Sequence, residues 1–414
     1  MEQNTQISFA ELRAFERDFY KSHQGQTTQK KNLTEEEVNA KYLKGEVRIV
    51  TEQARYPLPS LSELFSSNNY ILRPEFQRRH RWDVKKQSKL IESFIMNVPI
   101  PPIFLYEKDF SVYEVMDGVQ RVTAIKEFYE DRYALEGLDQ WEELNGKRYS
   151  QLPDQIRRGI DRRYISSIIL LKETAKSEEE ANRMKQMVFS RINSGGAKLE
   201  DQEYRNSQYA SAFNNMIIEL ARNPYFCEIF DIPAKTSDED LFGDNISEEL
   251  KENQLFSTMK DVEYVLRFFA MRNIHAWSKG TLSRFLDQIL YESSKLPVDK
   301  INQYKELFEQ TIKLAYDIYG DLVFQLRKKV YFEGDNFLWK WNNKPNLVVY
   351  DPVMVALSNH IEQKEKLLDK RVEIQAKTQA LFEQAESEWN GRNTAKTNVE
   401  QRINAIDGLL REVL

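Results

Sequence analysis

The chain is poor in the residues that disulfides, metal sites and tight turns require. Its 414 residues include one cysteine, Cys227, so no disulfide can form within the chain, and a reducing compartment is the expected environment. The four histidines, at positions 23, 80, 275 and 360, are far apart and form no HExxH pattern, which argues against a zinc site. Glycine (14) and proline (12) each make up about 3% of the chain, below the typical ~7% and ~5%, which predicts long helices.

Long apolar runs and an excess of positive charge are also missing. The longest apolar stretches, 98–106 and 165–171, fall far short of the roughly 20 residues that span a bilayer, and the polar N-terminus lacks the apolar core of a signal peptide. We therefore expect a cytoplasmic protein with no membrane partner. The formal net charge is −6, so contact with nucleic acid requires a local basic patch.

Several common catalytic motifs are absent as well. The sequence contains no P-loop, no GxSxG nucleophile turn and no recognisable His-Asn-His nuclease centre. Apolar residues make up 41% of the chain, which is enough to bury a sizeable core and argues against wholesale disorder.

The pattern of apolar residues predicts three parts: a helical N-terminal extension over 1–45, an α+β domain over 46–215 and a mostly α-helical domain over 216–414. In the second part we expect short strands over 47–50, 103–106, 112–116 and 165–171, and helices over 84–95, 119–129 and 177–192. Strand signals nearly vanish after about residue 210. Helical stripes follow over 258–272, 282–291, 299–319, 360–389 and 397–414.

The most informative segment is 113–123, where a predicted strand ends at Asp117, Gly118 permits a tight turn and a helix begins. A helix N-terminus offers free N–H donors and the positive end of the helix dipole, which together attract anions. Arg121 can bind a phosphate through its fork of donors, and Asp117 can hold a divalent metal or position a water. The alternative is that Asp117 caps the helix and Arg121 is a surface cation.

A second segment, 73–89, contains seven lysines and arginines and two acids, a local surplus of five positive charges in an acidic chain. Phe76 and Trp82 place aromatic rings among these cations, which suits phosphates or a stacked base. We expect DNA contacts here from four residues: Arg79, Arg81, Lys85 and Lys86. The alternative is a solvated basic turn with Trp82 packed in the core.

A third segment, 189–199, contains Asn193 followed by Ser-Gly-Gly. This sequence is an ordinary helix end, yet it also offers exposed N–H groups near Arg191 and Lys198. A helix end and an anion-binding turn both remain open.

In this order and spacing, the segments resemble the N-terminal domain of GmrSD-type modification-dependent restriction endonucleases, which has a ParB/sulfiredoxin-like fold. The motifs of that family are Pro-x-x-Gln-Arg-x-x-x-Trp, Pro-Ile-Pro-Pro, Asp-Gly-x-Gln-Arg and Asn-x-x-Gly-x-x-Leu, which occur here at 74–82, 99–102, 117–121 and 193–199. The helical remainder resembles the tails of single-domain members.

The resemblance implies a nucleotide-binding site and hydrolysis of a nucleoside triphosphate that regulates DNA cleavage. It implies Asp117, Gln120 and Arg121 as catalytic residues, with Asp117 as a ligand of Mg²⁺. Nucleotide contacts would come from Gln77, Arg78, Gly118, Thr123 and Asn193.

Two departures from the family matter. Val119 replaces the usual first glutamine of the Asp-Gly-Gln-Gln-Arg motif, and the His-Asn-His domain that completes these endonucleases is not detectable. The turn also lacks the cysteine that sulfiredoxins use there, which excludes sulfinic-acid repair.

Three hypotheses follow. The chain is a nucleoside triphosphate hydrolase of a prokaryotic restriction or anti-phage system, cutting DNA through a partner nuclease or an unrecognised metal-dependent centre. Alternatively it is a ParB-like nucleotide or DNA sensor without turnover, or a phosphotransferase. Asp117 favours catalysis, because a carboxylate repels a phosphate unless a metal bridges them.

The helical half is expected to be a partner or regulatory surface, with assembly into a homo-oligomer left open. Its two histidines have no neighbours at ligand spacing, so no catalytic residue is predicted there. One apolar stripe, which packs either on the domain or against another subunit, consists of Leu367, Leu368, Ile374, Leu381 and Phe382.

Overall fold

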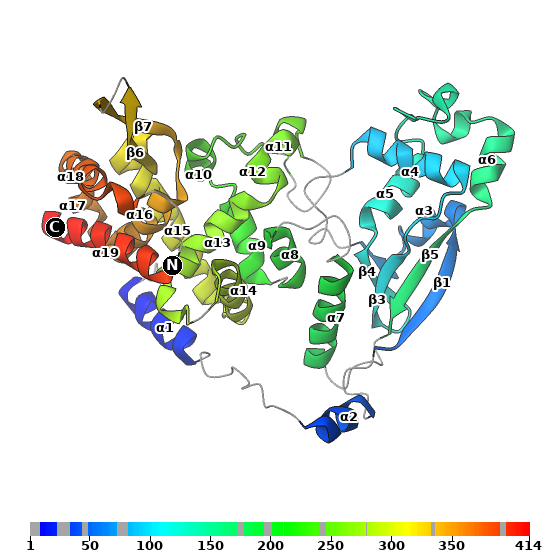
Figure 1. Cartoon of the computed structure of the whole chain (residues 1–414), viewed down its shortest axis with the longest axis horizontal. Helices are drawn as coiled ribbons and strands as arrows, with labels where there is room; N and C mark the ends of the chain where they lie inside the picture. Colours follow the sequence, from blue (N-terminus) through cyan, green and yellow to red (C-terminus); the bar gives the residue numbers. More distant parts are fainter. Residues whose placement is uncertain are drawn as a thin grey trace, which may run out of the picture. The chain divides into compact units, whose positions relative to one another are not determined.

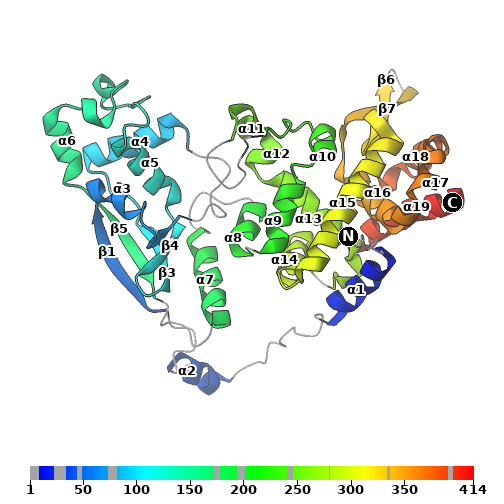
Figure 2. The same ribbon diagram turned by 180° about the vertical axis from the view of Figure 1, so that it is seen from behind.

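The computed structural model describes residues 9–22, 34–43, 49–72, 82–171, 178–193, 201–209, 211–237, 239, 246–278, 280–332, 336–389 and 395–414. The chain forms two compact units, which we call the sheet unit (29–199) and the helical unit (1–28 together with 200–414). Figure 1 shows both units, and Figure 2 shows them from behind. No described helix is long and apolar enough to cross a membrane.

The sheet unit is built on a mixed sheet of five strands in the order β1-β5-β3-β4-β2. Its strands are β1 (Thr51–Pro57), β2 (Tyr70–Ile71), β3 (Ile103–Asp109), β4 (Val112–Asp117) and β5 (Tyr164–Leu170). The central pair β3 and β4 is antiparallel, whereas β3 with β5 and β4 with β2 are parallel. The sheet therefore brings together strands that are distant in the sequence, and the ends of parallel neighbours meet at common edges.

One face of the sheet packs on a layer of helices: α3 (Leu61–Leu64), α4 (Val84–Met96), α5 (Val119–Tyr129) and α6 (Asp154–Asp161). Asp83 caps α4 by accepting a hydrogen bond from the Lys86 N–H (2.7 Å), and Asn97 ends it in the left-handed region before the prolines. The buried stripe of α4, including Ile91 and Phe94, packs into the same core as β3 and β5.

The opposite face of β4 is contacted by α7 (Glu178–Asn193). Because side chains alternate along a strand, Val115 points into the core while Glu114 points to the other face. There the Glu114 carboxylate accepts a hydrogen bond from Lys185 of α7 (Nζ–Oε1 2.6 Å). The helix α2 (Glu35–Leu43) precedes this unit's sheet in the chain.

The helical unit contains α1 (Phe9–Ser22) and the helices that follow residue 200. These are α8 (Asp201–Gln208), α9 (Ala212–Leu220), α10 (Pro224–Ile229), α11 (Glu248–Glu252), α12 (Gln254–Ser257), α13 (Lys260–Arg272), α14 (Leu282–Ser293), α15 (Val298–Tyr319), α16 (Leu347–Asn359), α17 (Lys364–Asp369), α18 (Arg371–Gln384) and α19 (Lys396–Val413). The predicted stripe of 367–382 packs on this unit's own core: Leu367, Ile374 and Phe382 are buried in it.

The α+β class with a helical C-terminal region is confirmed, but several element predictions were wrong. The described residues 49–50 of the strand predicted over 47–50 are not in a strand, and β1 begins at Thr51. β1 is an edge strand with mostly exposed residues, so it lacks the alternating apolar pattern that marks a half-buried strand.

In the helical unit the sequence analysis missed the antiparallel hairpin of β6 (Gln325–Phe332) and β7 (Asn336–Pro345). Its residues are largely exposed, so apolar alternation is again absent. The helix predicted over 360–389 is divided into α17, α18 and short turns. Helix α16 was missed because it is apolar on nearly every side, so no 3.6-residue stripe marks it.

Candidate nucleotide site

The turn between β4 and α5 requires glycine at position 118. Gly118 has φ +97°, a backbone conformation that L side chains rarely adopt. A Cβ at this position would lie 2.5 Å from Ile103 Cγ2, on the neighbouring strand β3. Asp117 therefore ends the strand and Val119 begins the helix without an intervening side chain, as the sequence predicts.

Asp117 and Arg121 form an ion pair across this turn. The Arg121 Nη2 donates to Asp117 Oδ2 (2.6 Å) and to the backbone carbonyl of Pro102 (3.3 Å). The Asp117 side chain is 36% exposed and that of Arg121 is 13% exposed. The Arg121 Nε is buried and has no hydrogen-bond partner among the described residues. Arg121 thus retains donor capacity beside a carboxylate that solvent can reach.

The N-terminus of α5 adds a second source of positive potential. Gly118 is the N-cap residue and has no side chain, so it cannot cap the first N–H groups of α5. These donors and the positive end of the helix dipole lie in the same first turn as Arg121. The arrangement can therefore hold an anion, with Asp117 at its edge.

Gln120 connects this turn to the basic segment predicted to line it. Its Oε1 accepts a hydrogen bond from the backbone N–H of Trp82 (3.2 Å). Trp82 is the last residue of the Pro-x-x-Gln-Arg-x-x-x-Trp motif and packs partly buried against the core of the sheet unit. The structure thus brings two motifs together that are about 40 residues apart in the chain. The predicted residues Gln77, Arg78, Arg79 and Arg81 lie outside the described residues.

The described part of the basic segment is partly neutralised by acids that the sequence analysis did not associate with it. Lys85 lies 3.6 Å from Glu136, and Lys89 forms a 3.0 Å ion pair with Asp139. Lys86 is exposed and stands over the ring of Trp82, 5.8 Å from its centroid. The local surplus of charge is therefore smaller than the sequence alone implies.

The remaining predicted nucleotide contacts, Thr123 and Asn193, belong to two different helices. Thr123 is half-buried in α5, one helical turn beyond Val119. Asn193 is the last residue of α7, and its side chain lies outside the described part of the chain.

Sequence reasoning missed the Glu114–Lys185 pair. Lys185 holds α7, the helix that leads to Asn193, against β4 just before Asp117, and its Nζ also lies 5.4 Å from the ring centroid of Tyr106. The only signal for this pair was an acid inside an otherwise apolar strand.

The metal ligands available at the turn suit Mg²⁺ that arrives bound to a nucleotide. Among the described residues, no group of three or more His, Cys, Asp or Glu side chains could hold a metal by itself. Mg²⁺ in phosphate-binding enzymes commonly has one or two carboxylate ligands, with phosphate oxygens and waters completing its shell. Asp117, about one-third exposed at a predicted phosphate site, can supply such a carboxylate.

The strand–glycine–helix turn lies in an α+β unit built on a mixed sheet. Residues 61–210, from α3 through α8, match the family model described as the GmrSD restriction endonuclease N-terminal domain. The resemblance inferred from the motifs is confirmed, whereas the ParB/sulfiredoxin-like fold remains a prediction. Searches of curated proteins and of solved structures found no match to the chain.

Proposed function

We propose that the chain binds and hydrolyses a nucleoside triphosphate as a component of a prokaryotic DNA restriction or anti-phage defence system. The observation that carries the proposal is the Asp117–Arg121 pair at the uncapped N-terminus of α5. The family of residues 61–210, described as a restriction endonuclease domain, supplies the DNA context.

In this proposal the phosphates bind at the first turn of α5. Arg121 donates to phosphate oxygens with the donors that Asp117 and Pro102 leave unused. Among the described residues only the oxygen of Gln120 is engaged, by the Trp82 N–H, and its amide N–H₂ group is assigned to the nucleotide. Gly118 allows the phosphates to approach the backbone.

Asp117 distinguishes a hydrolase from a simple binding module. A carboxylate next to a phosphate is repulsive, so it weakens binding unless it holds a cation or positions the attacking water. Mg²⁺ bound with the nucleotide would neutralise part of the phosphate charge, with Asp117 among its ligands. The exposure of Asp117 leaves room for this role.

The test compares Asp117→Asn with wild type in the presence of each nucleoside triphosphate, with and without DNA. We expect Asp117→Asn to reduce phosphate release at least about a hundredfold, because a positioned carboxylate typically contributes 10²–10⁴-fold. Without Mg²⁺ the same variant should bind nucleotide more tightly than wild type, since a repulsive charge has been removed. Asp154→Asn, an exposed acid of the same unit paired with Arg157, is the matched control.

Other outcomes identify the alternatives. Nucleotide binding without phosphate release in wild type would indicate a sensor, and transfer of labelled phosphate to an acceptor would indicate a phosphotransferase. Wild-type turnover in Asp117→Asn would show that the catalytic assignment is wrong. Strand cuts by the chain alone would replace the proposed partner nuclease with a centre in this chain.

DNA contact is the second part of the proposal, carried by the cations of 73–89. Lys85 and Lys86 are exposed, and Arg79 and Arg81 belong to the same segment of the sequence. Binding to phosphates through these residues should be largely independent of sequence and should weaken with salt. Charge reversal at Arg79 and Lys86 is expected to weaken DNA binding, measured by fluorescence anisotropy across a salt series. Binding that does not change between low and physiological salt would contradict this assignment.

A further inference from the structure

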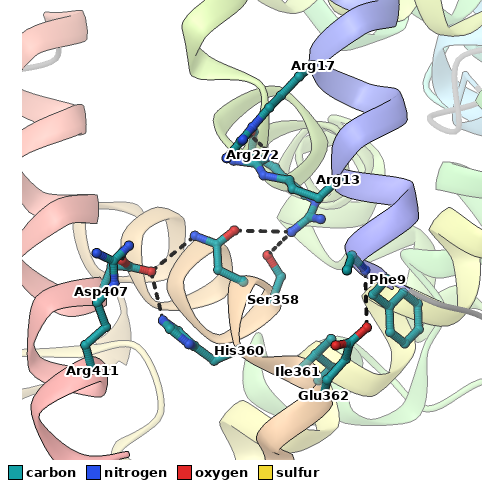
Figure 3. A pocket seen from close by; sticks show the side chains of 12 residues that line it. Phe9, Arg13, Arg17, Arg272, Ser358, His360, Ile361, Glu362, Asp407 and Arg411 are labelled. Atoms are coloured by element: carbon teal, nitrogen blue, oxygen red, sulfur yellow. Dashed lines mark hydrogen bonds and ion pairs between the residues drawn. The ribbon is translucent and has the colours of Figure 1, made fainter.

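The helical unit contains a pocket of about 340 Å³ that the proposed function does not use. It is enclosed by α1, the end of α13, the end of α16 with the turn that follows it, and α19 (Figure 3). Arg13, Arg17 and Arg272 gather on one side of it, and His360, Asp407 and Arg411 on the other (Figure 3).

On the other side of the pocket, the Asp407 carboxylate is fully engaged by neighbouring side chains. The Asp407 carboxylate accepts hydrogen bonds from His360 Nε2 (3.1 Å) and Asn359 Nδ2 (3.2 Å) and pairs with Arg411 (2.6 Å). Burial alone would raise the pKa of Asp407, but these partners hold it below its ordinary value. The opposite charges of Asp407 and Arg411 therefore balance on this side of the pocket.

The α1 side of the pocket has an excess of positive charge. Glu16, fully buried, lies between Arg272 (Nε–Oε1 2.8 Å) and Arg13 (Nη1–Oε2 3.1 Å). Arg17, one turn along α1 from Arg13, is exposed and has no hydrogen bond or ion pair to any described residue. Three guanidinium groups therefore line this side of the pocket with Glu16 between two of them, and Glu362, which accepts a hydrogen bond from the Ala10 N–H (3.2 Å), adds a second carboxylate to the lining.

Together with burial, the positive charges near Arg13 contribute to a lowered pKa of its guanidinium group. Burial lowers the pKa of Arg13, and the charge of Arg272 is the next cause. The pKa of His275, near the same cluster, is lowered by burial and then by Arg13. An anion bound between the arginines would relieve the repulsion between them.

We propose that this pocket binds a phosphate-bearing small molecule, independently of the site at Asp117. Guanidinium groups match phosphate oxygens with paired donors. Arg272 already donates to Ser358 Oγ (2.7 Å) and Asn359 Oδ1 (3.5 Å), so the donors for a ligand come chiefly from Arg17, which has no hydrogen bond to any described residue. Phe9 and Ile361 give the lining an apolar part, and the volume lies at the lower end for small-molecule pockets, which start near 300 Å³. A phosphomonoester with a small organic group would contact both the arginines and the apolar part of the lining. Free phosphate would be recognised by the arginines in the same way.

The test is isothermal titration calorimetry of the full chain carrying Arg121→Gln, so that binding at the site in the sheet unit is weakened. Inorganic phosphate, a nucleoside monophosphate and the unphosphorylated nucleoside are titrated separately, without Mg²⁺, at physiological salt. We expect saturable binding of one equivalent of a phosphate-bearing ligand, and no binding of the nucleoside. Tighter binding of the monophosphate than of phosphate would identify an organic ligand, and equal binding would identify phosphate itself.

Arg17→Gln is the decisive variant, because Arg17 makes no hydrogen bond or ion pair within the described part of the chain. It should weaken phosphate binding about tenfold or more, the loss expected for a charge-assisted hydrogen bond. Arg371→Gln removes an exposed arginine of the same unit outside the pocket and should leave binding unchanged. Absence of saturable binding, or equal weakening by both variants, would overturn the proposal.

Discussion

Two arginines of the helical unit, Arg205 and Arg222, are more completely hydrogen-bonded than Arg121 of the sheet unit. In the helical unit, all three guanidinium nitrogens of Arg205 donate hydrogen bonds, to Asp287, to Glu263 and Gln202, and to Ser283. Arg222 is likewise bound by Glu239, Cys227 and the Pro233 carbonyl. In the sheet unit, Arg121 has a buried Nε without a hydrogen-bond partner among the described residues.

This difference distinguishes two structural arginines from Arg121, which the proposed function assigns to the nucleotide. A buried ion pair repays its desolvation only when further hydrogen bonds satisfy both partners, and the pairs of Arg205 and Arg222 meet that condition. The pair of Arg121 and Asp117 does not meet it, and its carboxylate is one-third exposed. An arginine that is only partly bound can exchange partners when a ligand arrives, whereas a saturated one cannot do so without loss of stability.

The largest effect is expected from Arg222→Ala. The change leaves the Glu239 carboxylate, whose side chain is 3% exposed, without its cation. Breaking such a buried pair typically costs about 3–5 kcal/mol, so the helical unit should unfold at much lower urea concentration. Replacing both partners, as Arg222→Met with Glu239→Leu, should restore part of the loss. A shift below about 1 kcal/mol in the single variant would show that the pair is not structural.

The next effect concerns Gly118 and tests the turn itself. Gly118→Ala introduces both a left-handed alanine and a contact 2.5 Å from Ile103, and we expect a loss of about 2–4 kcal/mol. Gly146→Ala has a similarly positive φ of +81° but nothing within 4 Å, so its loss should be about 1 kcal/mol. Hydrogen exchange of β3 and α5 measures the difference. Equal losses would mean that the close approach to β3 is unimportant.

The variant Arg121→Gln tests how the loss of an incompletely bonded arginine differs from the loss of Arg222. Because Arg121 is incompletely bonded, its loss should cost less than about 1 kcal/mol of stability, against several for Arg222. Nucleotide affinity should nevertheless fall about tenfold or more, since a charge-assisted contact to phosphate is lost. Equilibrium binding of a fluorescent nucleotide measures this effect. A variant that is strongly destabilised yet binds normally would reverse the roles assigned to the two arginines.

The smallest effect is a pH dependence in the helical unit. Burial and the charge of Arg13 lower the pKa of His275, so between that pKa and about 6.5 the unfolded chain binds a proton that the folded chain does not. Stability should therefore fall as the pH decreases below about 6.5, by less than about 1 kcal/mol from this group. In His275→Gln this part of the dependence should disappear, as followed by thermal unfolding from pH 7.5 to 5.5. An unchanged pH profile would contradict the assignment.

Local sequence patterns were sufficient to predict those helices and turns that depend on residues close together in the chain. The helices α4 and α5 were predicted to within a residue or two, because their apolar stripes are regular and prolines or a glycine bound them. The turn at Asp117 and Gly118 followed from the same local signals. β1 and the β6–β7 hairpin escaped prediction because exposed strands carry no alternating pattern.

The sequence by itself determined the α+β class, the family of residues 61–210 and the strand–glycine–helix turn, because each depends on short-range order in the chain. Only the tertiary structure decided which polar groups meet. Gln120 with Trp82, Glu114 with Lys185, and Glu16 with Arg272 join positions separated by 38, 71 and 256 residues. Such pairs depend on how strands order in the sheet and how helices pack, and no periodicity along the chain records them.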